Sequence, residues 1–159
     1  TIGLLIYTVE YSTAPTSLTV ARSSASGAYN SIACVNVTGQ AGSYLDVVST
    51  STSGTSTTPT DTNLPNLTDD TDLVLGLMTR SGTSGTIAAG TNWTEVVELD
   101  EANSNQTLSV IQRTPGSTGS YDPAWTISSS DTWLVGGIAI KGTAGGGGGS
   151  TASMAWMTA

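Results

Sequence analysis

Short apolar runs of four to ten residues recur along the whole chain, separated by clusters of glycine, serine, asparagine and proline. None of these runs keeps the 3.6-residue period of an amphipathic helix, and several alternate apolar with polar positions. The pattern predicts an all-β fold. We expect nine strands, at residues 4–11, 17–22, 31–37, 44–48, 72–79, 93–99, 107–113, 124–128 and 132–141. Nine short strands in one domain are typical of a two-sheet β-sandwich or a jelly roll.

One plan of strands and turns occurs twice. Each copy has a strand, a proline-containing turn, a strand with a central threonine, a serine-rich turn, and an apolar strand that ends in glycine. The copies cover residues 4–39 and 108–142, and two further strands, at 72–78 and 93–99, precede only the second copy. We interpret the domain as two related halves. The first half lacks strands, so a sheet edge should be open for pairing with another chain.

The C-terminal part of the chain differs from the rest. We assign residues 1–142 to a β-sandwich domain, 143–150 to a glycine-rich tether and 151–159 to a tail. Five consecutive glycines in the tether have no side chains to pack and behave as a flexible linker. The tail is strand-like, with Met154 and Trp156 on one side of an extended segment and Met157 on the other.

A tethered apolar strand and a half that lacks strands suggest donor-strand addition, in which the tail of one subunit fills the vacancy in the next. Repetition of this head-to-tail contact gives a ring or a filament, and we favour a filament. The expected assembly interface consists of Met154, Ala155, Trp156 and Met157 of the tail with Leu4 and Ile6 of the acceptor. The alternative is that the tail folds back onto its own domain as a last strand, which the tether also permits.

Several motifs carry a resemblance to a known type of domain. They are the Asp72-Leu-Val-Leu and Asn92-Trp-Thr-Glu segments, the strands that follow the proline turns, and the apolar strands that close at Gly39 and Gly142. Over residues 4–142 the chain resembles a jelly-roll-like β-sandwich domain of phage virion proteins and bacterial secreted structural proteins. The resemblance implies a role at virion surfaces, in adhesion or in extracellular assembly. In such domains the first half opens with its own pair of strands, which this chain lacks.

Charge and composition narrow the function classes. Charged residues make up 10% of the chain, and a net charge of -8 with four cations provides no basic patch for nucleic acid or an anionic membrane. No apolar run is long enough for a membrane span, so we expect no membrane insertion. The absence of histidine removes the commonest general base and transition-metal ligand. We therefore expect no enzyme, with no catalytic residue, cofactor or metal site.

Two groups of acidic residues are interpreted in the same way. Glu95 and Glu98 are three residues apart on an expected strand and should point to opposite faces, so solvated edge charges are favoured over a pair for glycoside hydrolysis. Residues 69–72 contain three aspartates, but their spacing differs from that of calcium-binding loops. A turn stabilised by aspartate side chains is favoured there.

Candidate glycosylation sites favour an extracellular location, either in a secreted filament or on a virion surface. Four Asn-x-Thr sequons contain Asn36, Asn66, Asn92 and Asn105. The Ser/Thr-rich tract at 49–60 is typical of a flexible stalk or a long surface loop, and both place it in solvent. A first residue other than methionine is compatible with a leader that has been removed.

Four tryptophans raise the possibility of carbohydrate stacking. Trp125 and Trp133 occupy strand positions where filling the core is favoured, and Trp156 would anchor an interface. Two functions remain. The first is a structural subunit that assembles with copies of itself through its tail. The alternative is a module that binds surface glycans or a receptor.

Overall fold

The computed structural model describes Ile6, Thr8 and residues 32–101, 105–143 and 151–154. Within these residues the protein is all-β, with antiparallel strands and no helix, which confirms the predicted class. The strands are β1 (Val35–Thr38), β2 (Gln40–Val48), β3 (Thr52–Ser56), β4 (Leu73–Ser81), β5 (Ile87–Ala89), β6 (Thr94–Glu101), β7 (Gln106–Arg113), β8 (Trp125–Ile127), β9 (Asp131–Gly142) and β10 (Thr151–Met154).

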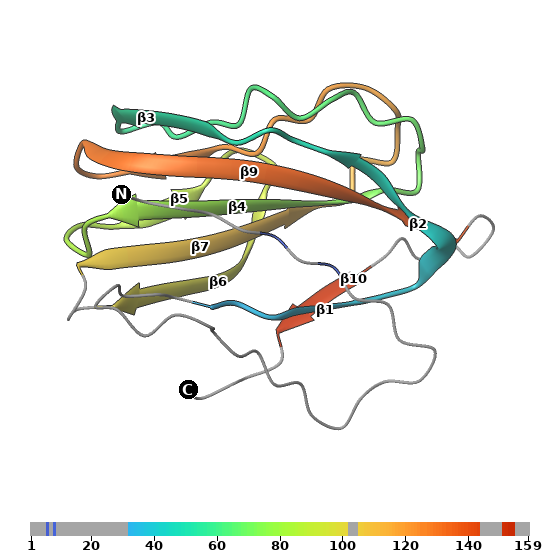
Figure 1. Ribbon diagram of the computed structural model, residues 1–159, viewed down its shortest axis with the longest axis horizontal. Coiled ribbons are helices and arrows are strands. Elements are labelled where there is room, and N and C mark those ends of the chain that lie inside the picture. The colour runs from blue at the N-terminus through green and yellow to red at the C-terminus, as the bar shows by residue number, and fades with distance from the viewer. Residues whose placement is uncertain (1–5, 7, 9–31, 102–104, 144–150, 155–159) are drawn as a thin grey trace.

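A six-stranded sheet forms the centre of the fold (Figure 1). Its strands follow the order β2-β9-β4-β7-β6, and β3 pairs with β9 next to β2. The two strands in the middle, β4 and β9, are buried at almost every position. Continuous burial of this kind is typical of strands that are covered on both faces.

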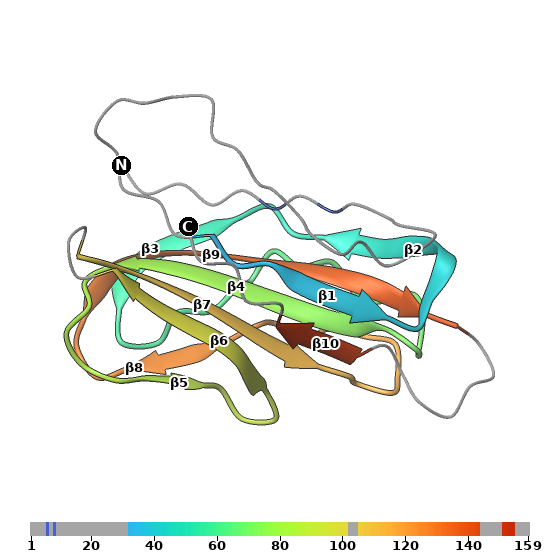
Figure 2. The same ribbon diagram turned by 90° about the horizontal axis from the view of Figure 1, so that it is seen from below.

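The first face of the central sheet, called the β8 face, holds most of the core. The register places Met78 opposite Val135, and both belong to an apolar cluster with Trp125 and Ile127 of β8. Strand β5 pairs with β8, so a small two-stranded sheet covers this face, and Figure 2 shows it below the central sheet. A second cluster, made of Leu64, Leu67, Val74 and Ala139, extends the core along the same face.

The opposite face of the central sheet, called the β1 face, carries the remaining apolar cluster. Leu73, Leu75, Ile138 and Ile140 form this cluster. Val35 and Val37 of β1 pack against it, together with Tyr44 and Ile6. Strand β1 therefore covers the second face, while its backbone pairs with β10 in a separate two-stranded sheet.

Close approach to the β8 face requires glycine at two positions of the central strands. Gly76 and Gly137 face each other across β4 and β9. A Cβ atom on Gly76 would lie 2.5 Å from the Cβ of Pro123, and one on Gly137 would lie 3.2 Å from the Cγ of the same proline. The pair of glycines therefore lets the segment before β8 lie directly on the sheet, which positions Trp125 in the core.

Most expected strands coincide with observed ones, and two differences have clear reasons. All expected strands from 31–37 onward are present, whereas 17–22 and most of 4–11 lie outside the described residues. Strands β3 and β5 were not expected, because Ser/Thr-rich and very short segments lack an apolar alternation. The placement of the whole 49–60 tract in solvent is wrong. Strand β3 pairs with β9, and the Oγ of Ser56 accepts a hydrogen bond from the indole N–H of Trp133 at 3.1 Å.

Candidate functional site

Among the described residues, the last strand, β10, pairs with β1. Thr151–Met154 of β10 run antiparallel to Val35–Thr38 of β1, with Met154 opposite Val35 and Ser153 opposite Asn36. These two strands form a sheet of their own rather than extending the central one. Strand β1 connects directly into β2 through Gly39, so the acceptor strand belongs to the N-terminal half of the domain.

The residues expected at the assembly interface are described only in part. Met154 lies in β10, and its backbone pairs with Val35. Ile6 is half-buried and packs against the apolar cluster on the β1 face. Leu4, Ala155, Trp156 and Met157 lie outside the described residues.

Three large apolar side chains near β1 are exposed among the described residues. Leu45 and Val48 are each 45% exposed and are paired with Ile140 and Ile138 on the β1 face. Ile32, three residues before β1, is 48% exposed. Together they place exposed apolar surface beside the strand that accepts β10.

All four sequon asparagines are exposed, but they differ in their surroundings. The side chains of Asn36, Asn66 and Asn92 lie at the surface. The side-chain oxygen of Asn105 accepts hydrogen bonds from the backbone and the hydroxyl of Thr83, at 3.3 and 3.4 Å. Thr107, the hydroxyl residue of that sequon, is completely buried. The first three sequons are therefore the accessible ones in the folded domain.

The tryptophans in the strands are core residues. Trp125 is 2% exposed and donates its indole N–H to Ser109 Oγ at 3.0 Å. Trp133 is 7% exposed and lies directly over Gly54, where a Cβ atom would approach within 2.6 Å of its ring. Neither side chain presents a ring face to a carbohydrate, which confirms the core interpretation. Trp156 lies outside the described residues.

The arrangement expected for the acidic residues of β6 is wrong. A register shift between Glu95 and Val97 inserts one extra residue into the strand. Glu95 then lies opposite Ile111 and Glu98 opposite Ser109, and both partners belong to the β8 face. Burial, and then the neighbouring charges of Asp100 and Glu95, raise the pKa of Glu98. Glu95 remains exposed. The two glutamates therefore form a row of like charges on one face of the edge strand β6.

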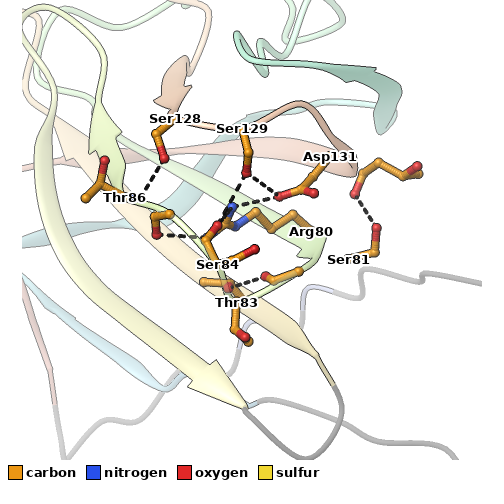
Figure 3. A network of polar contacts seen from close by, with 12 residues as sticks. Arg80, Ser81, Thr83, Ser84, Thr86, Ser128, Ser129 and Asp131 are labelled. Atoms are coloured by element: carbon orange, nitrogen blue, oxygen red, sulfur yellow. Dashed lines mark hydrogen bonds and ion pairs between the residues drawn. The ribbon is translucent and has the colours of Figure 1, made fainter.

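A buried arginine organises the end of the β8 face (Figure 3). Arg80 is completely buried and forms an ion pair with Asp131 at 2.8 Å. Its guanidinium also donates to the backbone carbonyl of Ser84 at 3.1 Å and reaches that of Gly85 at 3.5 Å. The arginine thus fixes the loop after β4 against the start of β9. These contacts pair the buried charge, although Arg80 Nε has no hydrogen-bond partner among the described residues.

A second charged group contains residues from three adjacent strands, and sequence reasoning did not identify it. Lys141 of β9 contacts Asp46 of β2, with 3.2 Å between Nζ and Oδ1. Asp72 precedes β4 by one residue and therefore lies beside Lys141, because Leu73 pairs with Ile140. The side chain of Asp46 is 2% exposed, and Asp72 is completely buried. The neighbouring Thr68 donates its backbone N–H to Asp46 Oδ2 at 2.7 Å and its hydroxyl to Oδ1.

The two carboxyl groups of this cluster titrate very differently. No donor group of the described residues reaches either oxygen of Asp72, and the group that faces it is the carboxyl of Asp46. Burial, followed by the hydrogen bond with Asp46 and its charge, raises the pKa of Asp72 to about 7. Burial opposes ionisation of Asp46 too, but hydrogen bonds from Thr68, Asp72 and Lys141 together lower its pKa to about 2. Asp72 therefore holds a proton that it shares with ionised Asp46.

The aspartates at 69–72 form a turn, as expected. Asp69 Oδ1 accepts hydrogen bonds from the backbone N–H and the hydroxyl of Thr71, at 2.9 and 2.6 Å. This is the side-chain-stabilised turn that aspartate favours. Within the described ranges no group of three or more histidine, cysteine, aspartate or glutamate side chains is placed to hold a metal ion.

The chain matches no family model, no curated protein and no solved structure. Among the described residues no helix exists that could cross a membrane.

Proposed function

We propose that this protein is an extracellular structural subunit that assembles head to tail by donating its C-terminal strand, β10, to strand β1 of a neighbouring copy. In this proposal the domain is a jelly-roll-like β-sandwich of two related halves. Its product is a secreted filament or a virion fibre. The partner is a second copy of the same chain, and no nucleic acid, membrane or cofactor takes part.

The observation that carries the proposal is the pairing of β10 with β1 in a sheet of their own. Strand β10 has four residues and belongs to a two-stranded sheet that is separate from the central sheet. A short pair of strands has little stability of its own, so the ladder depends on what β1 is packed against. Strand β1 is held by Val35 and Val37 on the central sheet, whereas β10 follows the glycine-rich tether. The same ladder therefore forms with equal geometry when β10 comes from another copy.

The tether sets how far a donated strand can reach. The eight residues 143–150 span at most roughly 26–29 Å when fully extended. A neighbour can accept β10 only if its β1 lies within this distance of the end of β9. The contact uses different surfaces on the two copies, so it repeats without closing unless the rotation forms a ring.

The composition of the surface supports an extracellular location. The chain has few charged residues, and three exposed sequons, at Asn36, Asn66 and Asn92, are accessible in the folded domain. Exposed Ile32, Leu45 and Val48 lie beside the acceptor strand and would be covered by a neighbouring subunit. The glycan-binding alternative receives no comparable support, because Trp125 and Trp133 are buried.

A pair of engineered cysteines distinguishes exchange from self-pairing. Asn36 and Ser153 are directly opposite across the ladder, so Asn36→Cys and Ser153→Cys place two thiols within disulfide range. Both substitutions are made in a Cys34→Ser background, because Cys34 is the one native cysteine of the chain. The two single variants are mixed in the unfolded state, refolded together and oxidised. Mass spectrometry of the intact products under non-reducing conditions then identifies the disulfide-linked species. We expect a mixed disulfide dimer, because the donor and acceptor thiols are on different chains.

The control keeps the thiol at position 153 and moves the other thiol from β1 to β3. Thr55→Cys lies on β3, which pairs with β9, and it should not form a mixed disulfide with Ser153→Cys. The double variant carrying Asn36→Cys and Ser153→Cys should give a covalent ladder of multimers. If that double variant yields only a cross-linked monomer, and the mixture yields no mixed dimer, the tail pairs with its own domain and the proposal is wrong.

A further inference from the structure

We propose that Lys141 and Asp46 condense spontaneously into an intramolecular isopeptide bond, between Nζ of the lysine and Cγ of the aspartate, with Asp72 transferring the protons. Three observations of geometry carry this. The lysine nitrogen lies 3.2 Å from the aspartate oxygen, the Asp46 side chain is 2% exposed, and the fully buried Asp72, beside Lys141, has no hydrogen-bond donor at either oxygen among the described residues. An ordinary ion pair explains the first observation but not the third.

The buried carboxyl of Asp72 is costly for folding. Its oxygens accept no hydrogen bond from the described residues, and native structures retain few buried polar atoms of this kind. Beside an ion pair, however, a protonated carboxyl supplies the proton that a condensation needs. One lysine ammonium, one carboxylate and one carboxylic acid hold the same protons as one amine and two carboxylic acids. Because Asp72 has a pKa raised to about 7, it carries this proton at neutral and mildly acidic pH.

The bonds that form and break in this condensation balance without any added reactant. A proton passes from Lys141 Nζ to Asp46 Oδ1 along the existing contact, which leaves a neutral amine and a neutral acid. The nitrogen lone pair then attacks Cγ, and the carbonyl electrons move to Oδ2. Asp72 gives its proton to the Oδ1 hydroxyl, which leaves as water, and takes one proton back from the nitrogen. The carbonyl re-forms, and the products are an amide, one water molecule and protonated Asp72.

Thr68 is placed to assist the developing charge. Its backbone N–H lies 2.7 Å from Asp46 Oδ2, the oxygen that becomes negative when the nitrogen attacks. A fixed backbone donor at that position stabilises an oxyanion without reorganisation. The Thr68 hydroxyl donates to Oδ1, the oxygen that leaves. Lys141 keeps 28% of its side chain exposed, so the water has a route out.

The strand arrangement supplies the driving force. Strands β2, β9 and β4 are neighbours in the central sheet, so the three side chains are held together by the ladder. Groups fixed in this way react with effective concentrations of about 10⁵–10⁸ M. This fixed proximity acts in the direction of the bond.

The position of the bond fits a protein under tension. Lys141 is two residues before Thr143, where the tether to β10 begins, and the bond would join β9 to the edge strand β2. A pull on the tail would then be carried into the sheet by a covalent link rather than by hydrogen bonds alone. This consequence rests on the proposed assembly, whereas the bond itself does not.

Intact mass of the purified, folded full chain tests the inference directly. After incubation at neutral pH and denaturation, we expect a mass lower than the sequence mass by one water molecule. Trypsin should yield residues 23–80 joined to residues 114–159 in one branched species, because Lys141 is no longer cleaved. A dehydrated aspartate elsewhere would also lose one water but would give no branched species. A folded wild-type chain with the full sequence mass would overturn the proposal, whatever the outcome of the strand-exchange experiment.

Variants assign the roles of the three residues. Lys141→Arg keeps the charge and should restore the full sequence mass. Asp72→Asn should slow or abolish the mass loss, whereas Asp69→Asn, a matched change in the adjacent turn, should leave it intact. Asp46→Asn should lose one ammonia molecule instead of water, because the same attack then expels nitrogen. Mass loss that persists in Lys141→Arg would contradict the assignment.

Discussion

At the scale of single residues, Asp72 is the most unusual group of the described structure. It is completely buried, its carboxyl faces Asp46, and its pKa is raised to about 7 from an ordinary 3.8. Arg80 is buried as well, but its guanidinium is paired with Asp131 and two backbone carbonyls. Arg80 is therefore a charge with a structural role, whereas Asp72 holds a proton that is available for a reaction.

The unlinked protein should become less stable as the pH rises. Asp72 binds a proton more tightly in the folded state than in the unfolded state, so its stabilising contribution is complete below about pH 3.8 and is lost by about pH 7. Asp46, with a pKa of about 2, acts oppositely, and its contribution is lost as the pH falls below 3.8. The Lys141→Arg variant should therefore be most stable near pH 4 and lose at most about 4 kcal/mol by pH 7.

Chemical denaturation of Lys141→Arg at several pH values measures this slope. Adding Asp72→Asn should remove most of the decline between pH 4 and pH 7, because the side chain no longer titrates. An equally steep decline in the double variant would show that another group is responsible.

At the scale of strands, the contact between Pro123 and the central sheet determines how closely the β8 segment packs. A Cβ atom on Gly76 would lie 2.5 Å from the Cβ of Pro123 and 3.0 Å from Ile111 Cγ1. Both partners are part of the packed interior, so neither has free space into which to move.

Gly76→Ala should lower the free energy of unfolding by about 1–3 kcal/mol, because the added methyl group overpacks this contact. Gly42→Ala is the matched control, since a Cβ atom there meets nothing within 4 Å. Urea denaturation with unchanged m-values compares the two variants. Equal stability of the two would mean that the segment before β8 is free to shift away from the sheet.

The sequence predicts most of the strands but not their neighbours. Apolar runs locate β4, β7 and β9 well, because strands buried on both faces consist almost entirely of apolar residues. The β-bulge in β6, which brings Glu95 and Glu98 to one face, has no local signal that separates it from a regular strand. Strand β3 is held by its pairing with β9 rather than by apolar side chains, so its hydroxyl-rich sequence looks like a loop.

The sequence likewise predicts the candidate sites only in part. The tether and the strand that follows it are evident from five glycines and an apolar tail, and β10 is found where a strand was expected. The identity of β1 as its partner depends on the packing of Val35 and Val37 on the central sheet. Asp46, Asp72 and Lys141 are far apart in the sequence, and only the order β2-β9-β4 brings them together.

At the scale of the whole molecule, the two proposals describe a subunit suited to a long assembly. The central sheet is covered on both faces, and β10, the strand proposed to join one copy to the next, follows β9 in the chain. An isopeptide bond between β9 and β2 would reinforce the sheet at the point where the tether leaves. Under these proposals, the function lies in the connections between strands and between copies rather than in a cleft.

The molar mass of the full chain in solution, compared with that of a chain ending at residue 150, tests the central claim most directly. Light scattering on both proteins at matched concentration gives this mass. We expect long polymers for the full chain and a folded monomer for the shortened one, because β1 then has no strand to accept. The same mass for both proteins would contradict assembly by strand donation.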